Sequence, residues 1–138
     1  MFAKPLVALA LLASIAMTAC DQSAPDATCE PHGTELKIAV LASRSHVFTK
    51  DCLAAPARQP FTIYFNNQDT SPHGNHNIHI VLADEDFVGE RAFHGTDITY
   101  EVGPIPAGTY EFHCDEHLEM KGTFIVAGAS TPTTGATA

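Results

Sequence analysis

Short runs of alternating hydrophobic and polar residues fill the middle of this chain, and most of them end near Gly, Pro, Asn or Asp. A period of two places successive side chains on opposite faces of an extended strand. The pattern predicts strands at residues 36–41, 61–65, 78–82, 98–102, 110–114 and 122–126. Many short strands between turn residues favour an all-β sandwich, here of about seven to eight strands.

The ends of the chain do not share this pattern. Residues 35–126 form the predicted domain, in which the segment 86–95 fits either a short helix or an irregular loop. Residues 20–34 are predicted to be a tether that precedes the domain. Residues 127–138 are small, polar and rich in Thr, and we expect a disordered tail because they cannot bury apolar area.

Residues 1–19 are predicted to be a signal peptide. Lys4 precedes an apolar run at residues 6–17, which is too short to span a membrane. The segment 17–20, MTAC, resembles a lipoprotein cleavage site, with a lipid attached to the thiol of Cys20. Ordinary secretion with cleavage nearby is the alternative. Both interpretations predict a periplasmic or other extracytoplasmic location, and the first adds a lipid anchor in the membrane.

The chain carries 16 acidic residues against 7 Lys and Arg, a formal net charge of −9. Nucleic-acid binding is therefore disfavoured, because phosphates require a basic surface. An acidic surface suits a basic protein partner that is guided by long-range attraction. The same charge would also serve solubility alone.

The most distinctive chemistry lies in the segment 114–122, CDEHLEMKG. Cys114, His117 and Met120 follow one another at intervals of three residues, directly after a predicted strand. Zinc is usually bound by Cys, His and carboxylates rather than by Met. One thiolate, two imidazoles and a weak axial thioether instead form the trigonal site of electron-transfer copper. The segment supplies three of these four ligands.

Several segments resemble the cupredoxins, the small blue copper proteins that include amicyanin, pseudoazurin and plastocyanin. The resemblance extends over about residues 52–126 and rests on residues 56–57, 61–69, 76–77, 106–110 and 114–122. The spacing between His117 and Met120 is most like the short amicyanin loop. The resemblance implies a Greek-key β-sandwich and one copper ion that cycles between Cu(I) and Cu(II).

The resemblance also implies the ligands. His76 is the upstream imidazole, with His73 as the alternative, and it completes a plane with Cys114 and His117. Met120 is the long axial ligand that tunes the potential. His117 is expected to show one edge at an apolar surface, whereas His76 is expected to be more enclosed.

Two further residues are expected to support the ligands. By the resemblance, the backbone N–H of Asn77 points towards the sulfur of Cys114, and its side chain joins the two ligand loops. The partner of Asn77 would be Asp115, where cupredoxins often carry Ser or Thr.

Four cysteines are present. With Cys20 assigned to lipid and Cys114 to copper, Cys29 and Cys52 remain. In an oxidising compartment we expect these two to form a disulfide, and two free thiols are the alternative.

The other histidines have simpler interpretations. His32, His46 and His94 are predicted to be solvated, and His79 to be a plain strand residue. His113 is predicted to lie at the surface, with partner docking or a pH response as the alternative. Eight histidines in a short chain also leave room for a second, weaker metal site.

The resulting hypothesis is an exported, monomeric electron carrier that serves a redox protein such as a basic cytochrome or an oxidoreductase. No enzyme activity is expected, because the chain lacks the Cys-x-x-x-Cys motif of a binuclear copper centre. A periplasmic copper-trafficking protein and a cupredoxin-like interaction module are the alternatives.

Overall fold

The structure is a computed structural model, and it describes residues 29–128. The predicted signal peptide, the lipid on Cys20 and nearly all of the predicted tail lie outside the described residues. No helix among those described is long and apolar enough to cross a membrane.

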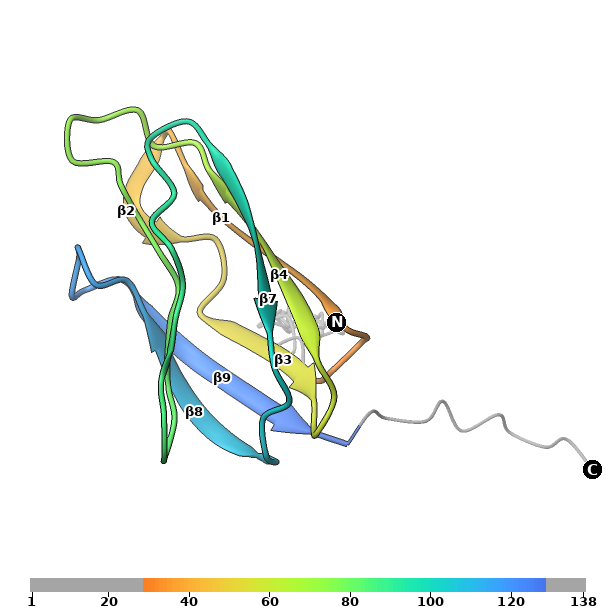
Figure 1. Ribbon diagram of the computed structural model, residues 1–138. Coiled ribbons are helices and arrows are strands. Elements are labelled where there is room, and N and C mark those ends of the chain that lie inside the picture. The colour runs from red at the N-terminus through yellow and green to blue at the C-terminus, as the bar shows by residue number, and fades with distance from the viewer. Residues whose placement is uncertain (1–28, 129–138) are drawn as a thin grey trace, which may run out of the picture.

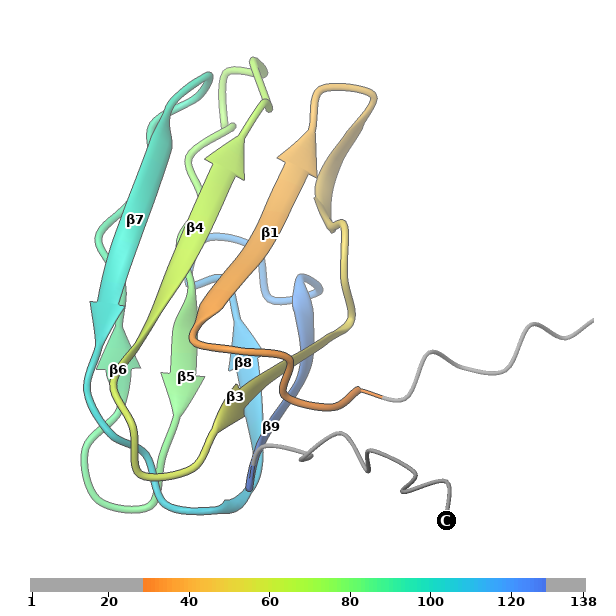
Figure 2. The ribbon, with the colours of Figure 1, turned by 90° about the vertical axis from the view of Figure 1, so that its right-hand side faces the viewer.

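Residues 29–128 contain nine strands in two sheets. The two sheets pack face to face (Figures 1 and 2). The strand bounds are β1 (Glu35–Leu41), β2 (Arg44–Phe48), β3 (Cys52–Pro56), β4 (Phe61–Asn67), β5 (His79–Val81), β6 (Phe87–Val88), β7 (Asp97–Val102), β8 (Gly108–His113) and β9 (Lys121–Ala127). One sheet has the order β2-β1-β4-β7 and the other β3-β9-β8-β5-β6. The predicted all-β sandwich is confirmed. Two pairs of neighbouring strands, β1 with β4 and β3 with β9, run parallel.

The strand count exceeds the expected seven to eight because three short strands carry little alternation of their own. β2 is mostly exposed, β3 reads CLAAP, and β6 has two residues. Each exists by pairing with a neighbour, respectively β1, β9 and β5. Residues 86–95 thus hold β6 followed by irregular chain, and no helix.

Aromatic side chains from both sheets fill the space between them. Phe61, Ile63 and Phe65 alternate inward from β4, and Phe112 and Phe124 face them from β8 and β9. The rings of Phe61 and Phe124 lie 5.6 Å apart across the sandwich. Burying each such side chain contributes about 2–3 kcal/mol, so this alternation is what closes the two layers.

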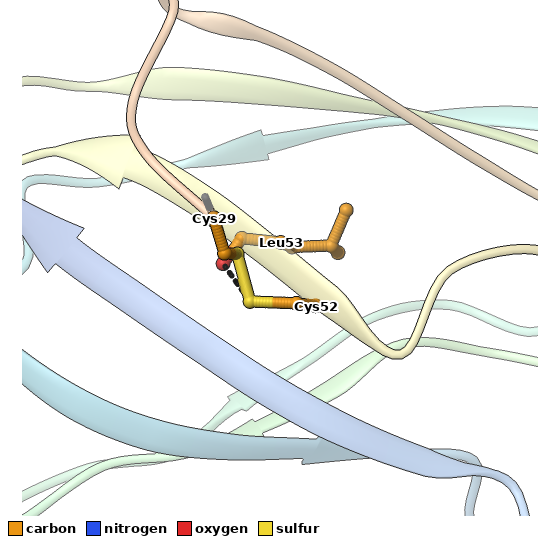
Figure 3. The surroundings of a disulfide bond; sticks show 3 residues. All are labelled: Cys29, Cys52 and Leu53. Carbon is orange, nitrogen blue, oxygen red and sulfur yellow. Dashed lines mark hydrogen bonds between the residues drawn. A yellow bond between two sulfur atoms is a disulfide. The ribbon is translucent and has the colours of Figure 1, made fainter. Parts of the chain in front are cut away.

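A disulfide joins Cys29 to Cys52, with the two Cα atoms 6.2 Å apart, as expected from the cysteine count. Figure 3 shows the bond between the segment that precedes β1 and the start of β3, beside Leu53. It therefore ties Cys29, within the predicted tether of residues 20–34, to the second sheet.

The parallel pairing of β1 and β4 decides which loops share one pole. Val40 of β1 is registered with Asn67 of β4, so both strands end at the same edge (Figure 2). The turn after β1 and the loop after β4 therefore lie side by side. His46 lies in β2, just after that turn, and His76 lies in the loop after β4. No local sequence pattern predicts that these two residues come close together.

Candidate metal centre

Three side chains from two distant segments converge beneath this pole. The Sγ atom of Cys114 lies 3.8 Å from Nδ1 of His76 and 3.8 Å from Nδ1 of His117. Cys114 and His76 are fully buried, whereas His117 is partly exposed. The enclosed position of His76 and the open edge of His117 are the arrangement that the sequence analysis expected. His73, the alternative to His76, is exposed.

The loop between β8 and β9 is closed by its own backbone. The Cys114 N–H donates to the Met120 carbonyl and the Met120 N–H to the His117 carbonyl, each at 2.9 Å. Met120 is buried. Gly122 lets β9 start directly over the Phe112 ring, since an added Cβ would come within 2.6 Å of it. The three predicted loop ligands are therefore held in one tight turn.

A buried carboxylate orients His76. Nε2 of His76 lies 2.9 Å from Oδ2 of Asp69, so the ring donates its N–H there and turns the Nδ1 lone pair to Cys114. Burial raises the pKa of Asp69, but hydrogen bonds from the Ser71 N–H and from His76 outweigh it and bring the pKa down to about 2. The sequence analysis did not single out Asp69, because one polar residue among several in the segment 61–69 carries no distinguishing signal.

Asn67 fixes the loop that carries Asp69. Its side-chain amide donates to the carbonyls of Gly74, Ala92 and Phe93, at 2.6, 3.0 and 3.1 Å. Its Oδ1 accepts the backbone N–H of Asp69 at 3.1 Å. One buried Asn thus satisfies groups from three parts of the chain, which removes freedom from the upstream ligand loop.

Asn77 and Asp115 join the two ligand loops. The Asp115 N–H donates to Oδ1 of Asn77 at 2.9 Å, and Nδ2 of Asn77 donates to Oδ2 of Asp115 at 2.7 Å. Burial raises the pKa of the Cys114 thiol, and backbone N–H groups including that of Asn77 oppose the rise. These N–H groups point at the sulfur and would stabilise a thiolate.

His46 is not solvated, and this prediction was wrong. Its ring stacks on His117 with centroids 3.9 Å apart and planes inclined by 23°. Its Nε2 is buried and has no hydrogen-bond partner among residues 29–128. Burial, then the neighbouring His46 and His76, lower the pKa of His117. His117 is therefore favoured in the neutral form that binds metals.

The donor set and its spacing fit a single copper ion. With a metal–sulfur bond of about 2.3 Å and a metal–nitrogen bond of about 2.0 Å, as in zinc sites, a trigonal angle separates sulfur from nitrogen by about 3.7 Å. A tetrahedral angle gives about 3.5 Å with the same bond lengths. The two observed separations of 3.8 Å are close to both values, so the two imidazole nitrogens and the sulfur are spaced to hold one metal ion between them. Two His and one Cys, with a nearby Met, are the ligand types of electron-transfer copper.

A family model for the cupredoxin-like domain matches residues 7–126. The chain belongs to the cupredoxin-like domain family. The predicted resemblance is therefore confirmed for the fold and for the family. No curated protein matches the chain significantly.

Solved cupredoxin structures share the fold. Dithionite-reduced auracyanin from the photosynthetic bacterium Roseiflexus castenholzii is 22% identical, with a TM-score of 0.59 over 68% of this chain and 97% of that one. Auracyanin A from Chloroflexus aurantiacus, described as a blue copper protein, is 19% identical, with a TM-score of 0.54 over 68% and 98%. The copper-containing nitrite reductase of Thermus scotoductus is 24% identical, with a TM-score of 0.51 over 67% and 22%. At these identities the likeness shows the fold alone, and the fold is shared by a blue copper protein and by a copper-containing nitrite reductase.

Proposed function

We propose that this protein is an exported blue copper protein that carries single electrons between redox partners. His76, Cys114 and His117 would hold the copper through Nδ1, Sγ and Nδ1, with Met120 as the axial ligand. Copper bound there supplies a one-electron couple between Cu(I) and Cu(II).

One observation carries the proposal: two imidazole nitrogens face one buried cysteine sulfur at equal distances of 3.8 Å. A simple buried cysteine would need no such partners. The same geometry on a loop that also buries Met120 is the donor set of an electron-transfer copper site.

The surrounding residues act by keeping this geometry constant. Asp69 holds the proton on Nε2 of His76, Asn67 fixes the loop of Asp69, and Asn77 ties the two ligand loops. Fast electron transfer requires little rearrangement between oxidation states. Support from buried hydrogen bonds on two packed sheets provides that stiffness.

Partner contact is supported by the surface next to His117. Leu118, which follows His117 in the chain, is 79% exposed. Exposed apolar side chains beside a partly exposed ligand suit brief contact with another protein. The formal charge of −9 favours a basic partner, such as a cytochrome or an oxidoreductase.

Export and anchoring belong to the same proposal. The Cys29–Cys52 disulfide suits an oxidising compartment, which agrees with the signal peptide expected at residues 1–19. Labelling of expressing cells with a radioactive fatty acid tests the lipid on Cys20. We expect labelled protein in the membrane fraction and its loss in Cys20→Ser, and an unlabelled wild-type chain would contradict the anchor.

The test of the copper site is a visible and EPR spectrum after one equivalent of Cu(II). We expect an intense thiolate charge-transfer band and a narrow hyperfine splitting. A pale, ordinary Cu(II) spectrum would contradict the proposed ligand set.

Copper trafficking is the second candidate, favoured by the additional histidines beside the ligand loop. The two functions differ in how readily the metal leaves. Rapid reversible reduction with copper retained against a Cu(I) chelator supports electron transfer, and rapid loss to the chelator supports trafficking.

A further inference from the structure

A second group of metal-binding side chains lies on the outer face of the sheet that carries Cys114. His79 of β5 and His113 of β8 are directly paired across the two strands. Their rings are 4.4 Å apart, and Asp115 follows two residues after His113. One ligand atom from each of the three lies within 4.8 Å of the others. The group is separate from the buried cluster of His76, Cys114 and His117.

The two imidazole rings converge on one carboxylate oxygen, Oδ1 of Asp115. Oδ1 of Asp115 lies 2.7 Å from Nδ1 of His79 and 3.5 Å from Nε2 of His113. Two ligands at tetrahedral angles on a zinc-sized ion are about 3.4 Å apart. The His113 distance already fits, and the His79 distance fits once a metal replaces the hydrogen bond. The side chains are 17, 20 and 32% exposed, so solvent can complete the coordination.

Each histidine also has a carboxylate beside its other nitrogen. Nε2 of His79 lies 3.2 Å from Oδ2 of Asp86, and Nδ1 of His113 lies 3.5 Å from Oε1 of Glu111. A carboxylate behind the ring is the usual support of a metal-bound histidine, because it fixes the tautomer and raises the basicity of the ligand nitrogen. His79 has that support as a hydrogen bond, whereas Glu111 lies near Nδ1 of His113 without a hydrogen bond to it.

Hydrogen bonding within the protein leaves His113 incompletely satisfied. Its Nδ1 is buried and makes no hydrogen bond to any residue in the described part of the chain. His79, in contrast, bonds to Asp115 and Asp86. A cation between His113 and Asp115 would give the His113 ring a strong partner on one side and draw Glu111 to the other.

From these contacts we infer a second metal site, in which His79 Nδ1, His113 Nε2 and Asp115 bind a divalent cation of the Zn²⁺ or Cu²⁺ class. Two imidazoles and a carboxylate match the ligands that these ions accept, and waters fill the remaining positions. Because its side chains are partly exposed, we expect the bound ion to exchange with solvent.

The site shares Asp115 with the support of the buried cluster. While Oδ1 faces the two histidines, Oδ2 and the backbone N–H bond to Asn77. Asp115 is also joined to Cys114 by a peptide bond. A bound cation therefore fixes and neutralises the carboxylate nearest to the Cys114 backbone.

Calorimetric titration with Zn²⁺ tests the inference on the mature chain loaded with Cu(I), so that the buried cluster is occupied. We expect one Zn²⁺ per chain and at least a 10-fold loss of affinity in His79→Gln and in His113→Gln. His32→Gln, which changes an exposed histidine outside both clusters, should bind like the wild type. NMR of the wild type should show that the imidazole signals of His79 and His113 move on Zn²⁺ binding.

Absence of Zn²⁺ binding, or equal affinity in wild type, His79→Gln and His113→Gln, would overturn the second site. The comparison of variants is also valid in the copper-free chain, because neither histidine belongs to the buried cluster. Failure of the copper proposal would therefore leave this test intact.

Discussion

The two histidine clusters each contain two imidazoles and meet at the neighbouring residues Cys114 and Asp115, yet they differ in burial, in the third ligand and in their support. The inner cluster is buried except for one edge of His117, contains a thiol and is supported by the hydrogen bonds of Asp69 and Asn77. The outer cluster is partly exposed, contains a carboxylate in place of the thiol and rests on two paired strands. Alternation along one strand end separates them, because Cys114 points into the core and His113 and Asp115 do not. If both clusters bind metal as proposed, one short segment offers a fixed site and an exchangeable site.

Among the changes that separate the two clusters, Cys114→Ser should have the largest effect, on the copper spectrum of the inner cluster. A hydroxyl cannot supply the soft thiolate, so we expect complete loss of the intense visible band after Cu(II) addition. His79→Gln, in the outer cluster, should keep the band. Equal spectra for Cys114→Ser and the wild type would show that Cys114 does not bind the copper.

Removal of the Cys29–Cys52 disulfide by double Ser substitution should weaken the scaffold under both clusters alike. The two cysteines are 23 positions apart in the sequence. Closing a loop of this length restricts the unfolded chain and contributes about 3 kcal/mol to the free energy of unfolding. Denaturant titration of the double variant measures this loss. The copper spectrum and Zn²⁺ affinity of the folded variant should stay unchanged, and a change in one cluster only would show an unsuspected link to the disulfide.

Asp69→Asn should lower copper affinity by about 10- to 100-fold, the usual cost of changing a carboxylate that supports a metal-bound histidine. Asn keeps one oxygen but loses the charge that accepts the N–H of His76. Asp86→Asn is the matched control, since Asp86 stands behind His79 in the outer cluster. Competition with a Cu(I) chelator measures the copper affinity of both variants. An equal loss of affinity in Asp69→Asn and Asp86→Asn would show that Asp69 has no special role behind His76.

Met120→Gln should keep copper and lower its reduction potential. A thioether favours Cu(I), and an amide oxygen favours Cu(II). Voltammetry of the purified variant gives the change directly. An unchanged potential would remove Met120 from the axial role.

Zn²⁺ in the outer cluster should raise the copper potential slightly, because a positive charge near Asp115 disfavours the more positive oxidation state. The effect is the smallest of the five, since solvent screens the exposed site. It should be absent in His79→Gln. A potential that Zn²⁺ leaves unchanged in the wild type would mean that the two clusters are electrostatically independent.

The alternating pattern and the loop spacing were sufficient to predict much of this protein. All six strands expected from the pattern are present, and Cys114, His117 and Met120 lie in the turn that their spacing predicted. Strand faces and tight turns are local properties of the chain. β2, β3 and β6 were missed because each depends on a neighbour for its pairing.

The family could thus be recognised, and a ligand set proposed, from the sequence by itself, since both rest on residue identity and short spacing. Three things were decided only by the tertiary structure: the carboxylate of Asp69 behind His76, the His46 ring on His117, and the pairing of His79 with His113. The His46 and His113 contacts join residues more than 30 positions apart, while Asp69 reaches His76 across an irregular loop. Parallel pairing of β1 with β4 and antiparallel pairing of β5 with β8 create these contacts, and no local pattern encodes strand pairing of this kind.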